Sequence, residues 1–210
     1  MDKSIRTIVF DVGMVLIDFC WDSCCRTLGF SEDVIQTFDE RMIHSDTWER
    51  LDEGTITTED AVTEFISRMP QYEKQVRMFW RKPELFVREY EYAAPMIAAL
   101  KEKGYPVFLL SNYPYDMYRL HWPSFLFYPM VDGYVVSALE RIKKPDPAIY
   151  QLLCERYGLK AQECLFVDDR QENVDAAIGV GMQAIRFTDY NSLIKKLQLE
   201  EAVQERRNNG

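Results

Sequence analysis

The sequence predicts an α/β protein built on a doubly wound parallel sheet, with an all-helical segment inserted near its N-terminus. From Ala93 onward, short runs of β-branched and aromatic residues alternate with helical patterns, as strands and crossover helices do in parallel sheets. A similar apolar run stands near the start, and about 70 residues with helix signals but no strong strand pattern follow it. The 210 residues are enough for one large domain with such an insertion.

The first strand is expected at Ile8–Phe10, a short buried run that ends directly at Asp11. In an open parallel sheet the ligand site lies at the carboxyl ends of the strands, so Asp11 stands where a functional carboxylate would. Gly13 follows, and its lack of a side chain lets the turn bring the backbone close to a ligand.

Helix signals dominate residues 19–90. Ser31 and Thr57 each precede acidic residues, as N-caps do, and Gly54 separates the two candidate helices. We therefore expect a core domain formed by residues 1–18 and 91–210, and a helical domain formed by residues 19–90.

The alternating pattern resumes with a helix that starts near Pro95 and ends at Gly104. Further strands are expected at residues 106–110, 134–137, 165–167 and 184–187. Further helices are expected at residues 147–158, 173–178 and 192–199, and the polar residues 200–210 are expected to fray. Polar pairs, Ser111-Asn112 and Asp168-Asp169, come directly after two of these strands.

The composition limits the possible partners. The net charge of −9 argues against a nucleic-acid partner, because the phosphate backbone of a nucleic acid repels an acidic surface. The sequence has no signal-peptide pattern and no run of 18 apolar residues, so we expect a cytoplasmic protein with no membrane partner. The five cysteines lack a regular spacing and are expected to be reduced thiols.

The residues that follow the strands form a candidate site. Asp11, Ser111, Asp168 and Asp169 should meet at one edge of the sheet, although they lie far apart in the sequence. Three carboxylates at close range repel one another, and a divalent cation such as Mg²⁺ would relieve that repulsion.

Three further side chains suit a phosphorylated ligand at this edge. Ser111 and Asn112 can donate hydrogen bonds to phosphate oxygens, and Lys144 can neutralise charge on a transferring phosphoryl group.

Four stretches, in this order, resemble the four motifs of the haloacid dehalogenase-like hydrolase superfamily. They are Phe10–Leu16, Leu109–Asn112, Lys143–Tyr150 and Phe166–Asn173. The resemblance spans nearly the whole chain and implies the Rossmann-like core of that family. The helical insertion is similar to the family's type 1 cap.

This resemblance implies an Mg²⁺-dependent phosphatase that acts on a small phosphorylated metabolite. Asp11 would attack the phosphorus atom and form an aspartyl-phosphate intermediate, which water then releases. Mg²⁺ would be held by the carboxylates of Asp11 and Asp169 and by the backbone carbonyl of Gly13. Asp168 would act through a metal-bound water or orient Lys144.

The sequence departs from the family pattern at Gly13, where most phosphatases of this family have an aspartate that serves as general acid and base. Its loss should affect basic alkoxide leaving groups most, since general acid catalysis typically contributes about 10²- to 10⁴-fold. The first motif resembles that of a subgroup containing α-D-glucose-1-phosphate phosphatase, which makes a sugar 1-phosphate a candidate substrate. Asp18 matches a later aspartate of that subgroup, and three roles are open to it: the missing acid, a sugar ligand, or a helix cap.

Two alternatives remain. A 2-haloacid dehalogenase shares the fold, but its pattern has an aromatic residue at the position of Gly13 and lacks the acidic pair Asp168-Asp169. A weakly active regulatory or binding member of the same fold is the second.

Other candidates to contact the substrate are Phe19, Trp21, His44 and Trp48 in the cap, and Tyr113, Arg119 and Arg141 in the core.

Overall fold

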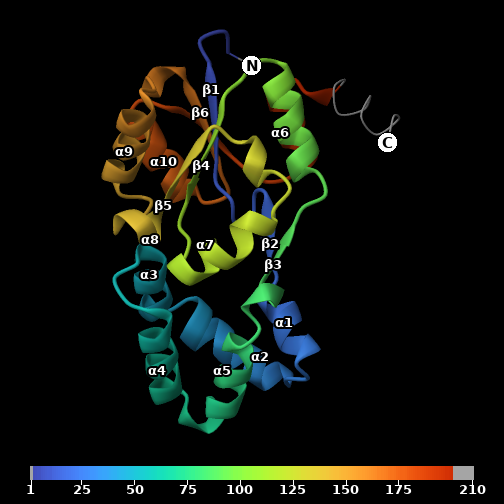
Figure 1. The fold of residues 1–210 in the computed structure, drawn as a ribbon, viewed down its shortest axis with the longest axis vertical. Helices are drawn as coiled ribbons and strands as arrows, with labels where there is room; N and C mark the ends of the chain where they lie inside the picture. The colour runs from blue at the N-terminus through green and yellow to red at the C-terminus, as the bar shows by residue number, and fades with distance from the viewer. Residues whose placement is uncertain (1, 201–210) are drawn as a thin grey trace.

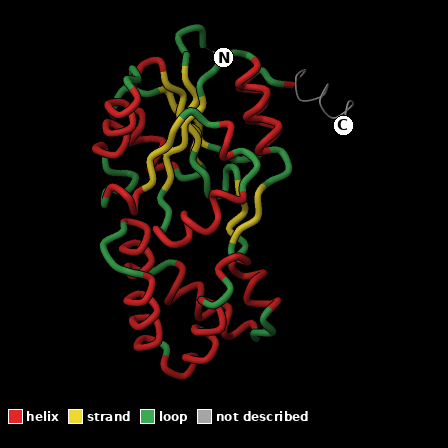
Figure 2. The backbone as a smooth tube through the Cα atoms, viewed as in Figure 1, coloured by secondary structure: helices red, strands yellow, loops and turns green. Residues whose placement is uncertain are grey.

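The computed structural model describes residues 2–200, and its centre is a parallel five-stranded sheet (Figures 1 and 2). The strands lie in the order β5-β4-β1-β6-β7, so β1 is the central strand, paired with β4 and β6. Their bounds are Thr7–Phe10 for β1, Val107–Ser111 for β4, Gly133–Val136 for β5, Cys164–Asp168 for β6 and Gln183–Arg186 for β7. The expected fold class is confirmed.

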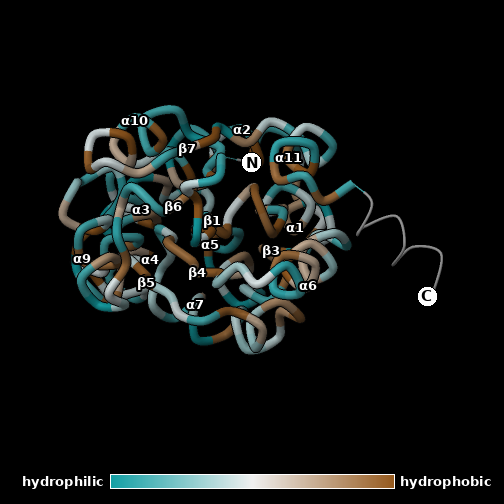
Figure 3. Tube along the Cα trace, turned by 90° about the horizontal axis from the view of Figure 1, so that it is seen from above, coloured by the Kyte–Doolittle hydropathy of each residue, from teal (hydrophilic) through white to brown (hydrophobic). Residues whose placement is uncertain are grey.

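Helices cover both faces of this sheet, and successive residues of a strand point to opposite layers. Ile8 and Phe10 belong to the larger apolar cluster, together with residues of α6 (Ala93–Glu102) and α11 (Tyr190–Leu197). Val9 belongs to the second cluster, with residues of α9 (Pro147–Tyr157) and α10 (Gln171–Gly179). In Figure 3 the hydrophobic trace gathers along the central strands, while hydrophilic segments dominate the periphery.

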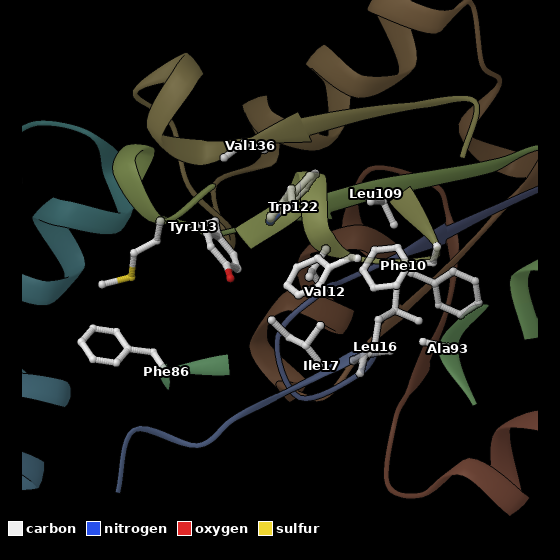
Figure 4. Packing of buried hydrophobic residues seen from close by; sticks show 14 of the residues in the cluster. Phe10, Val12, Leu16, Ile17, Phe86, Ala93, Leu109, Tyr113, Trp122 and Val136 are labelled. Carbon is white, nitrogen blue, oxygen red and sulfur yellow. The ribbon is translucent and has the colours of Figure 1, made fainter. Parts of the chain in front are cut away.

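Most of residues 12–17, which follow β1, pack into the apolar core. Val12 and Leu16 are fully buried, and Figure 4 shows them gathered with Leu109 and Trp122 from the second half of the chain. Because this packing holds both ends of the turn, the backbone at Gly13 has a defined position beside Asp11.

Residues between the first strand and the rest of the sheet form helices, which occupy the lower part of Figure 1. They are α1 (Trp21–Thr27), α2 (Glu32–Phe38), α3 (Asp46–Glu53), α4 (Thr58–Arg68) and α5 (Glu73–Trp80). Thr57 caps α4 through a capping box with Asp60, whereas Ser31 stands at the start of α2 without a side-chain cap bond. Phe79 stacks on Phe86 at 4.1 Å and holds α5 against the chain that returns to the sheet.

A short antiparallel pair that the sequence did not indicate joins the helical part to the sheet. It consists of β2 (Ile17–Phe19) and β3 (Val87–Glu89). Three-residue strands are too short to show an alternating pattern, so the sequence carried no signal for them.

Two further helices, α7 (Tyr115–His121) and α8 (Ser137–Glu140), follow β4 and β5 and were not predicted either. The five cysteines are free, and no described helix is long and apolar enough to cross a membrane. The stretch expected to fray lies outside the described residues, apart from Glu200.

Candidate active site

The structure places Asp11 directly after β1, at the carboxyl edge of the sheet. One oxygen, Oδ1, accepts a hydrogen bond of 2.7 Å from the backbone N–H of Val12 and lies 2.8 Å from Nζ of Lys144. These two contacts fix one oxygen of the carboxylate. No hydrogen bond or ion pair from a described residue reaches the other oxygen, Oδ2, which is therefore available for chemistry.

Lys144 is held between two carboxylates. Its Nζ donates to Oδ2 of Asp168 at 2.6 Å, and its side chain is only 1% exposed. The backbone of Lys144 is held as well, because the side-chain amide of Asn112 accepts from its N–H at 2.8 Å and donates to its carbonyl at 2.9 Å. The amide of Asn112 therefore positions the backbone of Lys144, and the expectation that Asn112 also donates to a phosphate stays a prediction.

Asp168 is saturated with hydrogen bonds. Besides Lys144, its carboxylate accepts from the side-chain amide of Asn173 at 2.9 and 3.0 Å and from the backbone N–H of Arg170 at 2.8 Å. Of the two roles implied for Asp168, this geometry matches the orientation of Lys144. Asn173, in the first turn of α10, is a supporting residue to which the sequence analysis assigned no role.

The carboxylates meet as expected. Oxygens of Asp11, Asp168 and Asp169 lie within 4.8 Å of one another. Burial raises the pKa of Asp11 to about 7, Lys144 opposes this rise, and Asp168 adds to it. Burial and the charge of Asp168 also raise the pKa of Asp169, whose side chain is half-buried. A carboxylate cluster that resists ionisation in this way suits a divalent cation, which would stabilise its charged form.

Ser111 ends β4 beside this cluster. It is 1% exposed, and its Oγ has no hydrogen-bond partner among the described residues. A buried hydroxyl without a partner is costly in a folded protein, so an anionic ligand that accepts its hydrogen bond would be stabilising.

A cavity of about 180 Å³ opens beside these groups, and both the sheet edge and the inserted helices line it. Its polar lining residues are Asp11, Asp52, Asn112, Lys144, Asp169, Arg170 and Asn173. Its mainly apolar lining residues are Met14, Ile17, Phe19, Trp48, Val87, Tyr113, Pro114 and Met117, and Gly13 completes the wall.

Only some of the residues expected to contact the substrate line this cavity. Phe19, Trp48 and Tyr113 line it, whereas the lining does not include Trp21, His44, Arg119 and Arg141.

The lining of the cavity does not include Asp18 either, so its expected role as a substrate-binding residue stays a prediction. Its neighbours Ile17 and Phe19 do line the cavity, and side chains alternate along a strand. The carboxylate of Asp18 forms an ion pair of 3.0 Å with Arg88, its partner across the β2–β3 pair. Asp18 is not the helix cap either, because Cys20 occupies that position before α1.

Magnesium binding can be measured by thermal unfolding of the metal-stripped protein. A ligand at a hundred times its Kd stabilises a protein by about 2.7 kcal/mol. For a chain of this length such a gain raises the Tm by roughly 5–10 °C. We expect this rise for the natural protein and for an Asp175→Asn control on the exposed side of α10, but not for Asp169→Asn. An equal rise in Asp169→Asn would refute the assignment of the cation to this cluster.

Comparisons with known proteins identify a family and related chains. A family model described as haloacid dehalogenase-like hydrolase matches residues 5–181. A sesquiterpene phosphatase of Aspergillus oryzae is 29% identical over 97% of this chain and 99% of its own length. A phosphatase of Mycobacterium tuberculosis is 26% identical over 86% of each chain.

The fold also matches solved structures. A structure with magnesium of an enzyme from Bacteroides thetaiotaomicron aligns with a TM-score of 0.73. The alignment covers 91% of this chain and 99% of that one, at 22% identity, which supports the shared fold alone.

Proposed function

The chain belongs to the haloacid dehalogenase-like hydrolase family, and we propose that it is an Mg²⁺-dependent phosphatase that forms an aspartyl-phosphate on Asp11. The observation that carries this proposal is the cluster in which Asp11 shares Lys144 with Asp168 and lies beside Asp169. Residues 19–90, called the cap from here on, would form a separate domain that supplies one wall of the cavity.

In this reaction Asp11 attacks phosphorus, the bond from phosphorus to the organic oxygen breaks, and water then hydrolyses the aspartyl-phosphate. Lys144 holds Asp11 in position and neutralises charge on the phosphoryl group, and Ser111 donates to a phosphate oxygen. Asp11, Asp169 and the carbonyl of Gly13 would hold Mg²⁺. When bound, the ion supplies Lewis-acid stabilisation of the phosphoryl oxygens.

The lining of the cavity supports a substrate with a compact apolar organic group. Two of the polar lining side chains already have partners inside the protein, because Asn112 bonds Lys144 and Asn173 bonds Asp168. The hydroxyl of Tyr113, in the mainly apolar part of the lining, is paired with His121 at 2.8 Å. Few groups are therefore left to bind the hydroxyls of a sugar, and the apolar wall would face an organic chain or ring. The relative from Aspergillus oryzae, named for a sesquiterpene substrate, agrees with this choice.

A dehalogenase is the weaker candidate. That reaction needs no metal, so it gives no reason for a third carboxylate, Asp169, within 4.8 Å of the other two. A regulatory or binding protein is also the weaker candidate. The buried Lys144, paired with both Asp11 and Asp168, argues for catalysis rather than for binding alone.

A panel of phosphate monoesters tests this proposal. We expect kcat/KM to be higher for prenyl and aryl phosphates than for glucose 1-phosphate and glucose 6-phosphate, because only the first two bury an apolar group against Phe19 and Trp48. EDTA should abolish turnover and Mg²⁺ restore it. A higher kcat/KM for glucose 1-phosphate would contradict the apolar substrate and favour a sugar phosphate. Release of halide from 2-chloropropionate without phosphatase activity would replace the proposed reaction.

A further inference from the structure

Asp52, in the last turn of α3, brings a carboxyl group from the cap to the wall of the active-site cavity. The side chain is half-buried, and no hydrogen bond or ion pair to it exists among the described residues. The two cations that act on it electrostatically are already paired, Lys143 with Glu49 at 3.1 Å and Arg170 with Glu172 at 2.5 Å. Asp52 is thus a cavity carboxyl without a structural partner.

The backbone at Asp52 is fixed to the core. Its carbonyl accepts a hydrogen bond from the hydroxyl of Ser137, and that hydroxyl accepts from the N–H of Tyr113 at 2.9 Å. Two residues later Gly54 adopts a left-handed conformation, and a Cβ there would lie 2.4 Å from the carbonyl oxygen of Ala138. Figure 1 shows the resulting close approach of α3 to α8. The backbone that carries Asp52 therefore has a defined place at the wall of the cavity.

Gly13, which lines the cavity two residues after Asp11, has no side chain that could supply a proton. A Cβ built on Gly13 would meet no atom within 4 Å, so the space beside Asp11 is open. Burial raises the pKa of Asp52 to about 7, Lys143 and Arg170 oppose this rise, and Asp11 and Glu49 add to it. A carboxyl with this pKa can both give and take a proton near neutral pH.

We propose that Asp52 is the general acid and base of the reaction, and supplies from the cap the proton transfer that Gly13 cannot supply from the core. This inference rests on the proposed phosphatase function. As Asp11 forms its bond to phosphorus, the bond to the leaving oxygen breaks and the proton of Asp52 moves to that oxygen, which leaves as an alcohol. The Asp52 carboxylate then takes a proton from the water that attacks phosphorus, and the bond to Asp11 breaks to release phosphate.

The test compares Asp52→Asn with the natural protein on phosphate monoesters of graded leaving-group basicity, from nitrophenyl through phenyl to alkyl phosphates. For alkyl phosphates we expect kcat/KM to fall by about 10²- to 10⁴-fold, because the leaving alkoxide then departs without a proton. For nitrophenyl phosphate we expect a fall of less than about 10-fold, since that phenolate needs no donor. Glu53→Gln is the control, because it removes the adjacent carboxyl, which does not line the cavity. This variant should change neither kcat/KM nor its dependence on leaving-group basicity.

Two further measurements keep the inference separate from the proposed function. Gly13→Asp added to Asp52→Asn should recover part of the lost alkyl phosphate activity, because the open space beside Asp11 then holds an acid. An equal loss for all leaving groups in Asp52→Asn would overturn the role of Asp52. If Asp52→Asn does not fold, a steep dependence of kcat/KM on leaving-group basicity in the natural protein would do the same. In either case activity that still requires Asp11 and Mg²⁺ would leave the phosphatase function standing.

Discussion

Replacing Asp11 with asparagine is expected to lower turnover of every phosphate monoester by on the order of 10⁴-fold or more, as loss of a catalytic nucleophile does in other enzymes. The amide keeps the shape of the side chain but has no anionic oxygen to attack phosphorus. Initial rates of phosphate release, with Mg²⁺ present, measure this effect.

The same variant should fold normally. Burial raises the pKa of Asp11 to about 7, above its usual value, so ionised Asp11 opposes folding as the pH rises from about 4 toward 7. A neutral amide at this position does not ionise, so the variant does not lose this stability. This gain offsets the lost contact with Lys144, and we expect a Tm close to that of the natural protein at pH 8. Substantial turnover by pure, folded Asp11→Asn would exclude covalent catalysis through Asp11.

Much of this site could be predicted because its carboxylates stand at or directly after the ends of buried strands. Asp11 follows β1 and Asp169 follows β6, and adjacent parallel strands bring their carboxyl ends together whatever lies between them in sequence. The family resemblance then identified Lys144, which no periodic pattern distinguishes from its neighbour Lys143.

The contacts that sequence reasoning missed join elements that lie far apart in the sequence. Asp52 is one acid among several on an amphipathic helix, and it lines the cavity where the end of α3 packs against α8. Asn112 suits a phosphate by its position, yet its amide matches the backbone of Lys144, 32 residues later. The ion pair of Asp18 with Arg88 was not visible either, because three residues are too few to show the two-residue alternation of β2.

Replacing Lys144 with methionine is expected to cost both stability and activity. Its ammonium is the side-chain cation that contacts both Asp11 and Asp168 in the described structure, and all three side chains are at least nine-tenths buried. Removing one partner of a buried ion pair typically costs about 3–5 kcal/mol. For a chain of this length that loss lowers the Tm by roughly 6–20 °C. Turnover should fall by about 10²- to 10³-fold, the usual effect of losing one group that stabilises the transition state.

The stability loss should depend on pH in a defined direction. The charge of Lys144 holds the pKa of Asp11 down against burial, so the variant raises that pKa further above about 7. A raised carboxyl pKa removes stability as pH rises through it, because the unfolded chain releases its proton more readily. The difference in Tm between the variant and the natural protein should therefore be larger at pH 9 than at pH 6, in metal-free buffer.

Lys143→Met is the matched control for this stability measurement. It removes the adjacent lysine, whose partner Glu49 has a side chain 68% exposed, and an exposed pair of this kind contributes at most about 1 kcal/mol. If both variants lose the same Tm at both pH values, Lys144 does not bind the two carboxylates as the structure describes. The same result would remove the reason for assigning it to the phosphoryl group, since its place beside Asp11 depends on that contact.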